Sequence, residues 1–228
     1  MSLAIFDLDN TLIAGDSDHS WGEFLVEQQI VDSISFTQAN DRFYQDYQSG
    51  ELDIEAYLAF ALEPLTRFTM TELADLHQTF MREKIQPLHL PKAAELIDKH
   101  RQAGDTLLII TATNSFITRP IADWLGVENL LACDPEIVDG RYSGRTINTP
   151  CFQHGKVTRL QEWLEGTDSS LKNSYFYSDS ANDIPLLDAV THPIAVDPCP
   201  RLLRHARQHG WPIISLRDQL EGAPEWPV

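Results

Sequence analysis

The chain has 228 residues, of which 43% are hydrophobic and 22% are charged, as is usual for a soluble globular protein. Its net charge is −17, and a field of that sign repels nucleic acids and anionic membranes, so neither is expected as a partner. No apolar run approaches the roughly 20 residues of a membrane span. The three cysteines form no CxxC pair, which argues against a disulfide framework or a zinc site and favours a reducing cytoplasm. The oligomeric state stays open.

Residues 3–6 are a continuous apolar run with no basic segment before it, so we expect a first strand and not a signal peptide. Residues 16–85 differ, because they contain almost no β-branched runs and several amphipathic stretches. Helices are expected at 36–48, ending at Gly50, and at 53–62. We therefore expect a helical domain at 16–85, inserted after the first strand of a core domain that comprises residues 1–15 and 86–228.

Further continuous apolar runs follow at 107–110, 175–177, 194–196 and 213–214. Continuous runs are typical of strands in a parallel sheet that is covered on both faces. Helical segments lie between most of them, at 91–103 and at 155–164. This alternation predicts a three-layer α/β fold. Asp139-Gly140, between strand-like residues, predicts a hairpin.

Two carboxylates follow the first predicted strand directly. Asp7 and Asp9 are two residues apart, so their side chains point the same way if the extended backbone continues. The carboxyl ends of parallel strands are where sheets of this kind bind ligands. Taken alone, the pair is explained at least as well by a role in capping a turn or a helix.

Polar groups also follow the second strand and open a later helix. Thr111 and Ala112 come after residues 107–110, where a hydroxyl group and free backbone amides can hold a phosphate, although helix capping explains Thr111 as well. Lys156 opens a predicted helix directly after Gly155. A single lysine in such a place usually belongs to the solvated surface.

The strand at 175–177 is followed by Asp179, Asn182 and Asp183, which are weak evidence singly because loops are rich in Asp and Asn. Together, these strand ends would place carboxylates, a hydroxyl group and a cation around one crevice. Carboxylate oxygens suit Mg²⁺, which keeps several waters and accepts a substrate phosphate oxygen. Such a crevice could hold a magnesium ion together with a substrate phosphate.

The order of these motifs is specific. Asp-Leu-Asp-Asn-Thr at 7–11, a strand ending at Thr111, then Lys156, then Ser-Asp-Ser-Ala-Asn-Asp at 178–183 resemble the four signature motifs of the haloacid dehalogenase superfamily. The helical insert and the Asp-Gly hairpin are similar to its phosphoserine phosphatase-like branch. The resemblance implies a Rossmann-like core with a C1-type helical cap, and a phosphatase.

The resemblance also implies catalytic roles. Asp7 would be the nucleophile that becomes an aspartyl-phosphate. Asp9 would protonate the leaving oxygen and later activate water, a role that dehalogenase relatives cannot fill because they lack this carboxylate. Lys156 would neutralise the nucleophile and the phosphoryl group.

The resemblance further implies binding roles. Thr111 would hold a phosphoryl oxygen, and Asn182 would contact the phosphate or orient the lysine. The metal would be Mg²⁺, bound by Asp7, the backbone carbonyl of Asp9 and Asp179. Asp183 would bind the metal directly or stand behind its ligands.

For the substrate, Asp16 occupies the position at which phosphoserine phosphatases carry a Glu that binds the substrate amine. Their Arg for the substrate carboxylate aligns with Ala59. This disfavours phosphoserine and favours histidinol phosphate, which has an amine and an imidazole but no carboxylate. Residues 15–22 also resemble a bacterial subgroup often labelled as histidinol-phosphatases. We expect Trp21 in the core of the insert. His19 lies either at the entrance or on a solvated edge, and Asp18 either helps to bind a cation or lies on the same edge.

Three alternatives stay open at this point. The enzyme could be a phosphoserine phosphatase after all, or it could pass its phosphoryl group to an alcohol instead of water. A receiver-like switch also phosphorylates an Asp at a strand end, but Asp9 and the helical insert argue against it.

Overall fold

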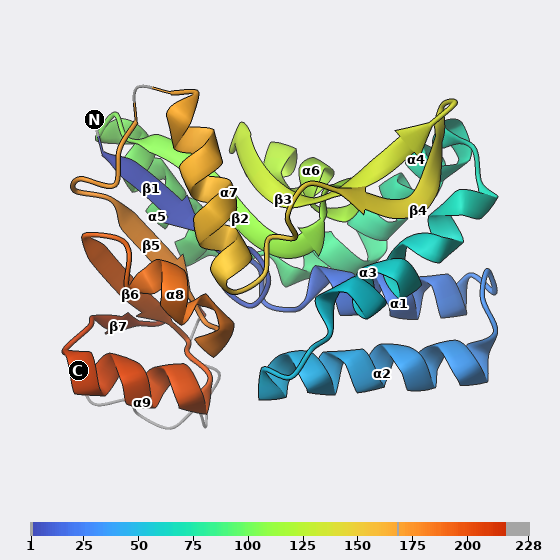
Figure 1. Cartoon of the computed structure of the whole chain (residues 1–228), viewed down its shortest axis with the longest axis horizontal. Coiled ribbons are helices and arrows are strands. Elements are labelled where there is room, and N and C mark those ends of the chain that lie inside the picture. The colour runs from blue at the N-terminus through green and yellow to red at the C-terminus, as the bar shows by residue number, and fades with distance from the viewer. Residues whose placement is uncertain (1, 168, 218–228) are drawn as a thin grey trace.

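Seven strands form one sheet in the computed structural model, which describes residues 2–167 and 169–217. Their order is β4-β3-β2-β1-β5-β6-β7, with β1 at the centre (Figure 1). Neighbouring strands are parallel, except that β4 is antiparallel to β3. The bounds are β1 Leu3–Phe6, β2 Thr106–Asn114, β3 Asn129–Val138, β4 Arg141–Ile147, β5 Tyr175–Ser178, β6 His192–Val196 and β7 Ile213–Ile214.

Helices cover both faces of this sheet. Successive strand residues point to opposite faces, so Ala4 and Phe6 pack into one apolar cluster, whereas Leu3 and Ile5 pack into another. The first cluster includes residues of α5 and α6, and the second includes residues of α7, α8 and α9. The bounds are α5 Pro91–Gln102, α6 Ser115–Trp124, α7 His154–Glu165, α8 Ile184–Leu187 and α9 Pro200–His209. The predicted three-layer α/β fold is confirmed.

Four further helices lie between β1 and β2. They are α1 Ser17–Glu27, α2 Ser33–Ser49, α3 Ile54–Leu62 and α4 Met70–Phe80. Short 3₁₀ turns at Glu63–Arg67 (η1) and Gln86–Leu88 (η3) and a π-helical turn at Met81–Ile85 (η2) link α3, α4 and α5, and a fourth turn, η4, spans Ala181–Asp183. Side chains cap α1, α2, α3 and α4 at their N-termini and accept hydrogen bonds from backbone amides that have no partner inside the helix.

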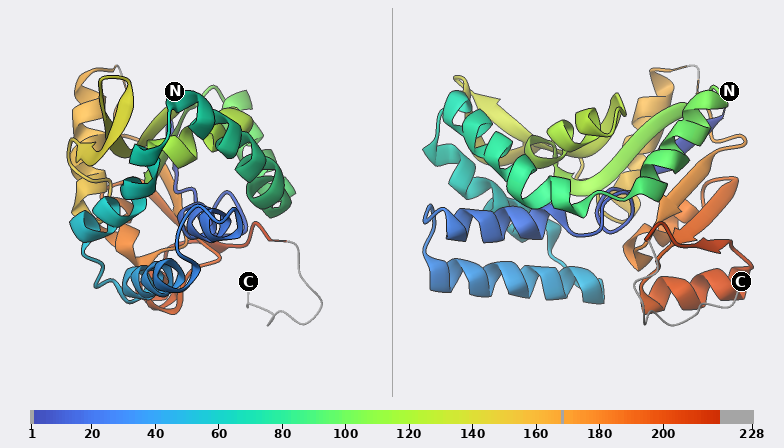
Figure 2. Two further views of the ribbon diagram at one scale, coloured as in Figure 1. Left: turned by 90° about the vertical axis from the view of Figure 1, so that its right-hand side faces the viewer. Right: turned by 180° about the vertical axis from the view of Figure 1, so that it is seen from behind.

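Part of this helical segment shares the core of the sheet. Trp21 and Phe24 of α1 and Phe80 of α4 belong to the same buried cluster as Phe6. The His77 Nε2 atom lies 3.0 Å from the Ile117 carbonyl oxygen of α6. In contrast, α2 buries only two side chains and lies beside α1 on the outside of the molecule (Figure 2). The interior position expected for Trp21 is confirmed, since that side chain is 2% exposed.

The hairpin predicted at Asp139-Gly140 joins β3 to β4. Both residues have positive φ, 50° and 76°, as a tight two-residue turn between twisted strands requires. Several boundaries differ from those expected from the sequence. β3 already starts at Asn129, β2 continues beyond Thr111 to Asn114, and α2 starts at Ser33, three residues before the expected start. None of the helices in the described ranges is long and apolar enough to cross a membrane.

Candidate active site

Asp7 and Asp179 approach each other because β1 and β5 are neighbours in the sheet. The backbone amide of Asp7 donates to the Tyr177 carbonyl oxygen at 2.9 Å, which continues the pairing of the two strands by one residue. The Thr11 hydroxyl lies 3.5 Å from an Asp7 oxygen and 3.4 Å from an Asp179 oxygen. It also accepts a hydrogen bond from the Asp179 amide at 3.1 Å. Thr11 therefore holds the two strand ends in a fixed relation.

Lys156 reaches this point from the N-terminal end of α7. Its Nζ atom lies 2.8 Å from Asp7 Oδ1 and 2.7 Å from Asp183 Oδ1, and the side chain is 1% exposed. Burial lowers the pKa of Lys156, but the charges of Asp183 and Asp7 outweigh this effect and hold the pKa above its ordinary value. The other Asp183 oxygen accepts a hydrogen bond from the Ser178 hydroxyl at 2.7 Å. Asp183 is thus fully engaged in positioning the ammonium group beside Asp7.

Gly155 permits this approach. A Cβ atom at this position would overlap the carbonyl oxygen of Pro150, so any other residue would push the start of α7 away from the loop that precedes it. Because Lys156 follows directly, such a shift would move the ammonium group.

Two elements that lie far apart in the sequence, α1 and β2, hold the Asp9 carboxylate. One carboxylate oxygen accepts a hydrogen bond from the Ser17 amide of α1 at 2.7 Å, and the other accepts one from the Thr113 hydroxyl of β2 at 2.9 Å. Burial raises the pKa of Asp9 to about 7, with a further contribution from the charge of Asp16. A carboxyl group with a pKa near neutrality can both give and take a proton, as a general acid and base must.

The strand ends carry more negative charge than Lys156 can balance. Burial raises the pKa of Asp7 to about 7, despite the opposing charge of Lys156. The pKa of Asp179 is also raised, first by burial and then by the charges of Asp7 and Asp183. A divalent cation between Asp7 and Asp179 would offset both effects, and carboxylate oxygens are the donors that Mg²⁺ prefers.

No group of three His, Cys, Asp or Glu side chains forms a metal cage within the described ranges. Mg²⁺ does not require one, because it is usually bound through one or two carboxylates together with waters and substrate phosphate. Asp7 and Asp179 meet that requirement, so the residues present fit a magnesium ion.

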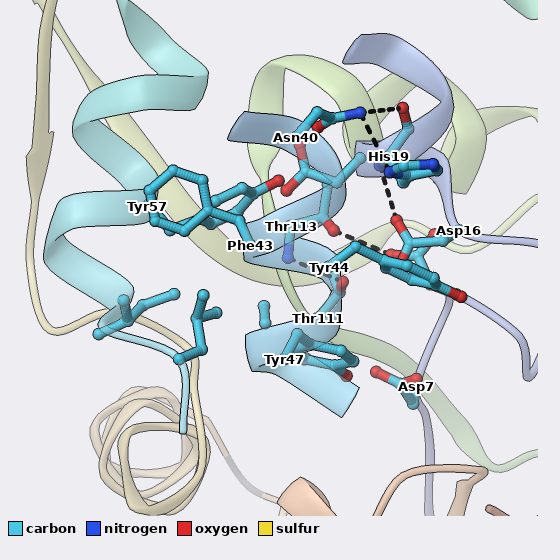
Figure 3. Close-up of a pocket in the computed structure, with 15 residues that line it drawn as sticks. Asp7, Asp16, His19, Asn40, Phe43, Tyr44, Tyr47, Tyr57, Thr111 and Thr113 are labelled. Carbon is cyan, nitrogen blue, oxygen red and sulfur yellow. Dashed lines mark hydrogen bonds between the residues drawn. The ribbon is translucent and has the colours of Figure 1, made fainter. Parts of the chain in front are cut away.

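A pocket opens between these strand ends and the helices of the insert (Figure 3). Its floor includes Asp7, Asp9, Thr111 and Ala112, which the sequence placed at a phosphate site. Thr113 of β2 forms part of the wall. The rest of the wall comes from α1, α2, α3 and the segments beside them, namely Asp16, Asp18, His19, Asn40, Phe43, Tyr44, Tyr47, Leu52, Ile54 and Tyr57.

Within residues 2–167 and 169–217, no Lys or Arg lines the pocket. Asp16, predicted as an anchor for an amine, lines it and also caps α1 by accepting from the His19 amide at 2.8 Å. Burial raises the pKa of Asp16 to about 7. Ala59 is exposed and lies outside the lining, to which α3 contributes Ile54 and Tyr57.

Asn182 contacts the insert. Its Nδ2 atom donates to the Tyr47 carbonyl oxygen near the end of α2 at 2.9 Å, and its Oδ1 atom lies 3.5 Å from Gln153 Nε2. Gln153 also reaches the Gly50 carbonyl oxygen at 3.5 Å, and Arg201 donates to that of Ser49. The core thus holds the carbonyl end of α2 through three side chains.

Most of the pocket wall was not predicted from the sequence. Phe43, Tyr44 and Tyr47 form an aromatic stripe on α2, and the spacing of Phe43 and Tyr47 places them on one face. That stripe was the available signal, but it equally fits an apolar core. Tyr57 and Thr113 gave no signal of their own.

A family model for haloacid dehalogenase-like hydrolases matches residues 4–188 of the chain. The chain belongs to this family. The matched range contains all four motifs, from Asp7 to Asp183, so the resemblance deduced from them is confirmed.

Three similar proteins share most of its length. A Neisseria meningitidis serogroup C (strain 8013) protein named histidinol-phosphatase is 44% identical, across 95% of this chain and 99% of its own. The Mycobacterium tuberculosis (strain ATCC 25618 / H37Rv) protein named phosphoserine phosphatase SerB1 is 31% identical, across 94% of this chain and 70% of its own. A crystal structure of a Bordetella pertussis Tohama I protein of unknown function has a TM-score of 0.89 and 45% identity, across 95% and 99%. Within the haloacid dehalogenase-like hydrolases, this chain is a phosphatase.

Proposed function

We propose that the enzyme is a magnesium-dependent phosphomonoester hydrolase that works through an aspartyl-phosphate on Asp7. The observation that carries the proposal is the buried contact of Asp7 with Lys156 at 2.8 Å, at the floor of a pocket that also contains Asp9. A carboxylate held beside a buried ammonium group can approach the phosphorus of a phosphate dianion without the full cost of like-charge repulsion.

In the first step, an Asp7 oxygen forms a bond to phosphorus while the bond from phosphorus to the substrate oxygen breaks. Asp9 donates its proton to the departing oxygen, which leaves as an alcohol. In the second step, Asp9 removes a proton from water, and the water oxygen displaces Asp7 to release inorganic phosphate. Thr111 and the backbone at Ala112 hold the phosphoryl oxygens. Lys156 remains charged throughout.

Asp7, Asp179 and the backbone carbonyl of Asp9 would hold Mg²⁺. The ion would supply positive charge to the phosphoryl oxygens. Asp183 would not bind the metal directly, because both of its carboxylate oxygens already contact Lys156 or Ser178. Its role would be to position Lys156. We further infer a cytoplasmic enzyme, consistent with the unpaired, buried Cys133 and Cys151.

We propose histidinol phosphate as the substrate. Asp16 offers a carboxylate to its amine, and no Lys or Arg in the described part of the chain lines the pocket to meet a substrate carboxylate. Phosphoserine is the second candidate, because a relative with 31% identity carries that name. Its carboxylate would meet Asp16 and Asp18 without a cation, which is unfavourable in a buried site.

Phosphate release in the presence of Mg²⁺ tests this proposal directly. We expect kcat/KM for histidinol phosphate to exceed that for phosphoserine by about 100-fold or more, because a buried charge without a partner penalises the wrong substrate. p-Nitrophenyl phosphate, which has neither an amine nor a carboxylate, is the reference. Equal kcat/KM for all three esters would refute histidinol phosphate as the preferred substrate while leaving the phosphatase chemistry intact.

We also propose that residues 16–85 act as a cap over the pocket. Asn182 would help to hold this cap closed through its hydrogen bond to α2. Asn182→Ala removes the 2.9 Å hydrogen bond to the Tyr47 carbonyl. We expect KM to rise about 3- to 10-fold with little change in kcat, as befits one neutral hydrogen bond. Hydrogen exchange at residues 44–50 should become faster. Gln48→Ala, an exposed change on the same helix, is the control.

A different result would assign Asn182 to another role. If kcat fell about 100-fold while hydrogen exchange in α2 stayed unchanged, Asn182 would act on the phosphate or on Lys156 instead of on the cap.

A further inference from the structure

Asp18 is a buried carboxylate that the proposed chemistry does not use. It lies in the first turn of α1, lines the pocket and is 8% exposed. Among the residues that the structure describes, no Lys, Arg or His forms an ion pair with it. A charged group in this environment normally has a partner of opposite sign.

A neutral donor from another element lies beside Asp18. Burial raises the pKa of Asp18 to about 7, and the interaction with the Tyr57 side chain opposes this rise. Burial and the charges of Asp18 and Asp16 hold the pKa of Tyr57 well above its ordinary value, so Tyr57 keeps its proton and faces Asp18 as a donor. A carboxylate has about four acceptor positions. The Thr113 hydroxyl proton is donated to Asp9, so the one neutral donor, Tyr57, leaves Asp18 with acceptor capacity that faces the pocket.

Asp16 and Asp18 serve different parts of the pocket. In Figure 3, Asp16 lies beside Tyr44 and His19, whereas Tyr57 lies on the opposite side of Thr113. The His19 and Tyr44 rings are stacked with centroids 4.7 Å apart, and the Phe43 and Tyr57 rings meet edge to face at 5.3 Å. Each carboxylate thus has aromatic groups beside it, and aromatic faces favour cations.

Asn40 gives an independent sign that this part of the pocket accepts hydrogen-bond donors. It lines the pocket and is 5% exposed. Its Nδ2 atom lies 3.0 Å from His19 Nδ1 and donates to the His19 carbonyl oxygen at 3.1 Å. Its Oδ1 atom receives no hydrogen bond from any described residue. An amide oxygen has two acceptor positions, so Asn40 Oδ1 can accept an N–H group of a ligand in the pocket.

We propose that Asp18, with Tyr57 and Asn40, forms a second cation subsite, so that the enzyme selects phosphate monoesters that carry two cationic or N–H-donating nitrogen groups. Asp16 would bind the group nearer the phosphate, and Asp18 would bind a second amine or a protonated imidazole ring. Leu52 and Ile54 line the same pocket and provide apolar surface against the flat faces of such a ring. This inference rests on the proposed function, because it assumes that Asp7 attacks a phosphate ester.

The test compares kcat/KM for histidinol phosphate, which has an amine and an imidazole, with that for phosphoethanolamine, which has the amine alone. In the wild type, the ratio of the two values should favour histidinol phosphate. Asp18→Asn should lower this ratio about 10- to 100-fold, mainly through KM for histidinol phosphate, because a charge-assisted hydrogen bond becomes a neutral one. Asp16→Asn should lower kcat/KM for both esters.

Two further variants keep the comparison interpretable. Tyr57→Phe retains the ring but removes the hydroxyl group, and it should lower the same ratio about 3- to 10-fold. It replaces Asp18→Asn if thermal unfolding shows that the latter is not folded. Asp75→Asn removes an exposed carboxylate from α4, outside the pocket, and should leave the ratio unchanged.

The outcomes separate the two hypotheses. If folded Asp18→Asn and Tyr57→Phe retained the wild-type ratio while the wild type released phosphate from the esters, the second subsite would be refuted and the phosphatase chemistry would stand. If the wild type released phosphate from no ester, p-nitrophenyl phosphate included, the proposed function itself would fail.

Discussion

Asp7→Asn should reduce phosphate release by about 10⁴-fold or more, since removing the nucleophile eliminates the covalent route and leaves only binding and electrostatic effects. The asparagine has almost the same shape as the aspartate and keeps an oxygen that can accept from Lys156. The fold should therefore persist, and the loss should appear in kcat. The measurement is phosphate release with Mg²⁺, together with transfer of labelled phosphate to the protein.

Asp75→Asn is the matched control, because it removes the same charge at an exposed position of α4. Thermal unfolding of both variants shows whether the fold is retained. Phosphate release that survives in well-folded Asp7→Asn would show that Asp7 is not the nucleophile, and the proposed aspartyl-phosphate mechanism would be wrong.

Lys156→Met should impair both catalysis and folding. Methionine has a similar length but no charge, so Asp7 and Asp183 would lose the buried ammonium group that lies within 2.8 Å of both. We expect kcat to fall about 10²- to 10³-fold, as for loss of one preorganised group that stabilises the transition state. We expect the free energy of unfolding of the metal-free protein to fall by about 3–5 kcal/mol, since two buried carboxylates remain without a partner.

The loss of stability should depend on pH. The pKa of Asp7 is about 7 even beside Lys156, and removal of the lysine can only raise it. A carboxyl group whose pKa is higher in the folded than in the unfolded protein loses folding stability as pH rises through the shifted range. Lys156→Met should thus be closer to the wild type at about pH 6 than at about pH 8.

Chemical unfolding at the two pH values measures this difference. Lys99→Met, an exposed lysine of α5, is the control. A loss of stability that is the same at both pH values would contradict the assignment of buried, unpaired carboxylates as its cause.

The sequence determined the architecture and the floor of the site. The apolar runs at β1, β2 and β5 are local patterns, and parallel strands carry their carboxyl ends to one edge of the sheet. Asp7 and Asp179 follow β1 and β5 directly, and Thr111 follows the apolar run 107–110 within β2, so their meeting follows from strand order alone. Lys156 could be assigned because it follows a glycine at the start of a helix, within a family-specific order of motifs.

Most of β3 was not predicted from the sequence, because pairing with its neighbouring strands determines it more than its own composition does. Residues 129–138 contain Pro135 and two acidic residues, and only residues 137–138 looked extended. Parallel pairing with β2 and antiparallel pairing with β4 supply the backbone hydrogen bonds, and those partners lie elsewhere in the chain.

The walls of the pocket were decided by tertiary packing. Helical spacing indicates which side chains share a face, but not what that face meets. Asp18 meets Tyr57 because α1 packs into the core through Trp21 and α3 lines the same pocket, a relation between segments about 40 residues apart. Asn182 likewise meets the end of α2, a contact that its place in the motif at 178–183 did not indicate. The residues proposed to perform the chemistry lie in local motifs, whereas those proposed to select the substrate acquire their role from long-range packing, which no local pattern encodes.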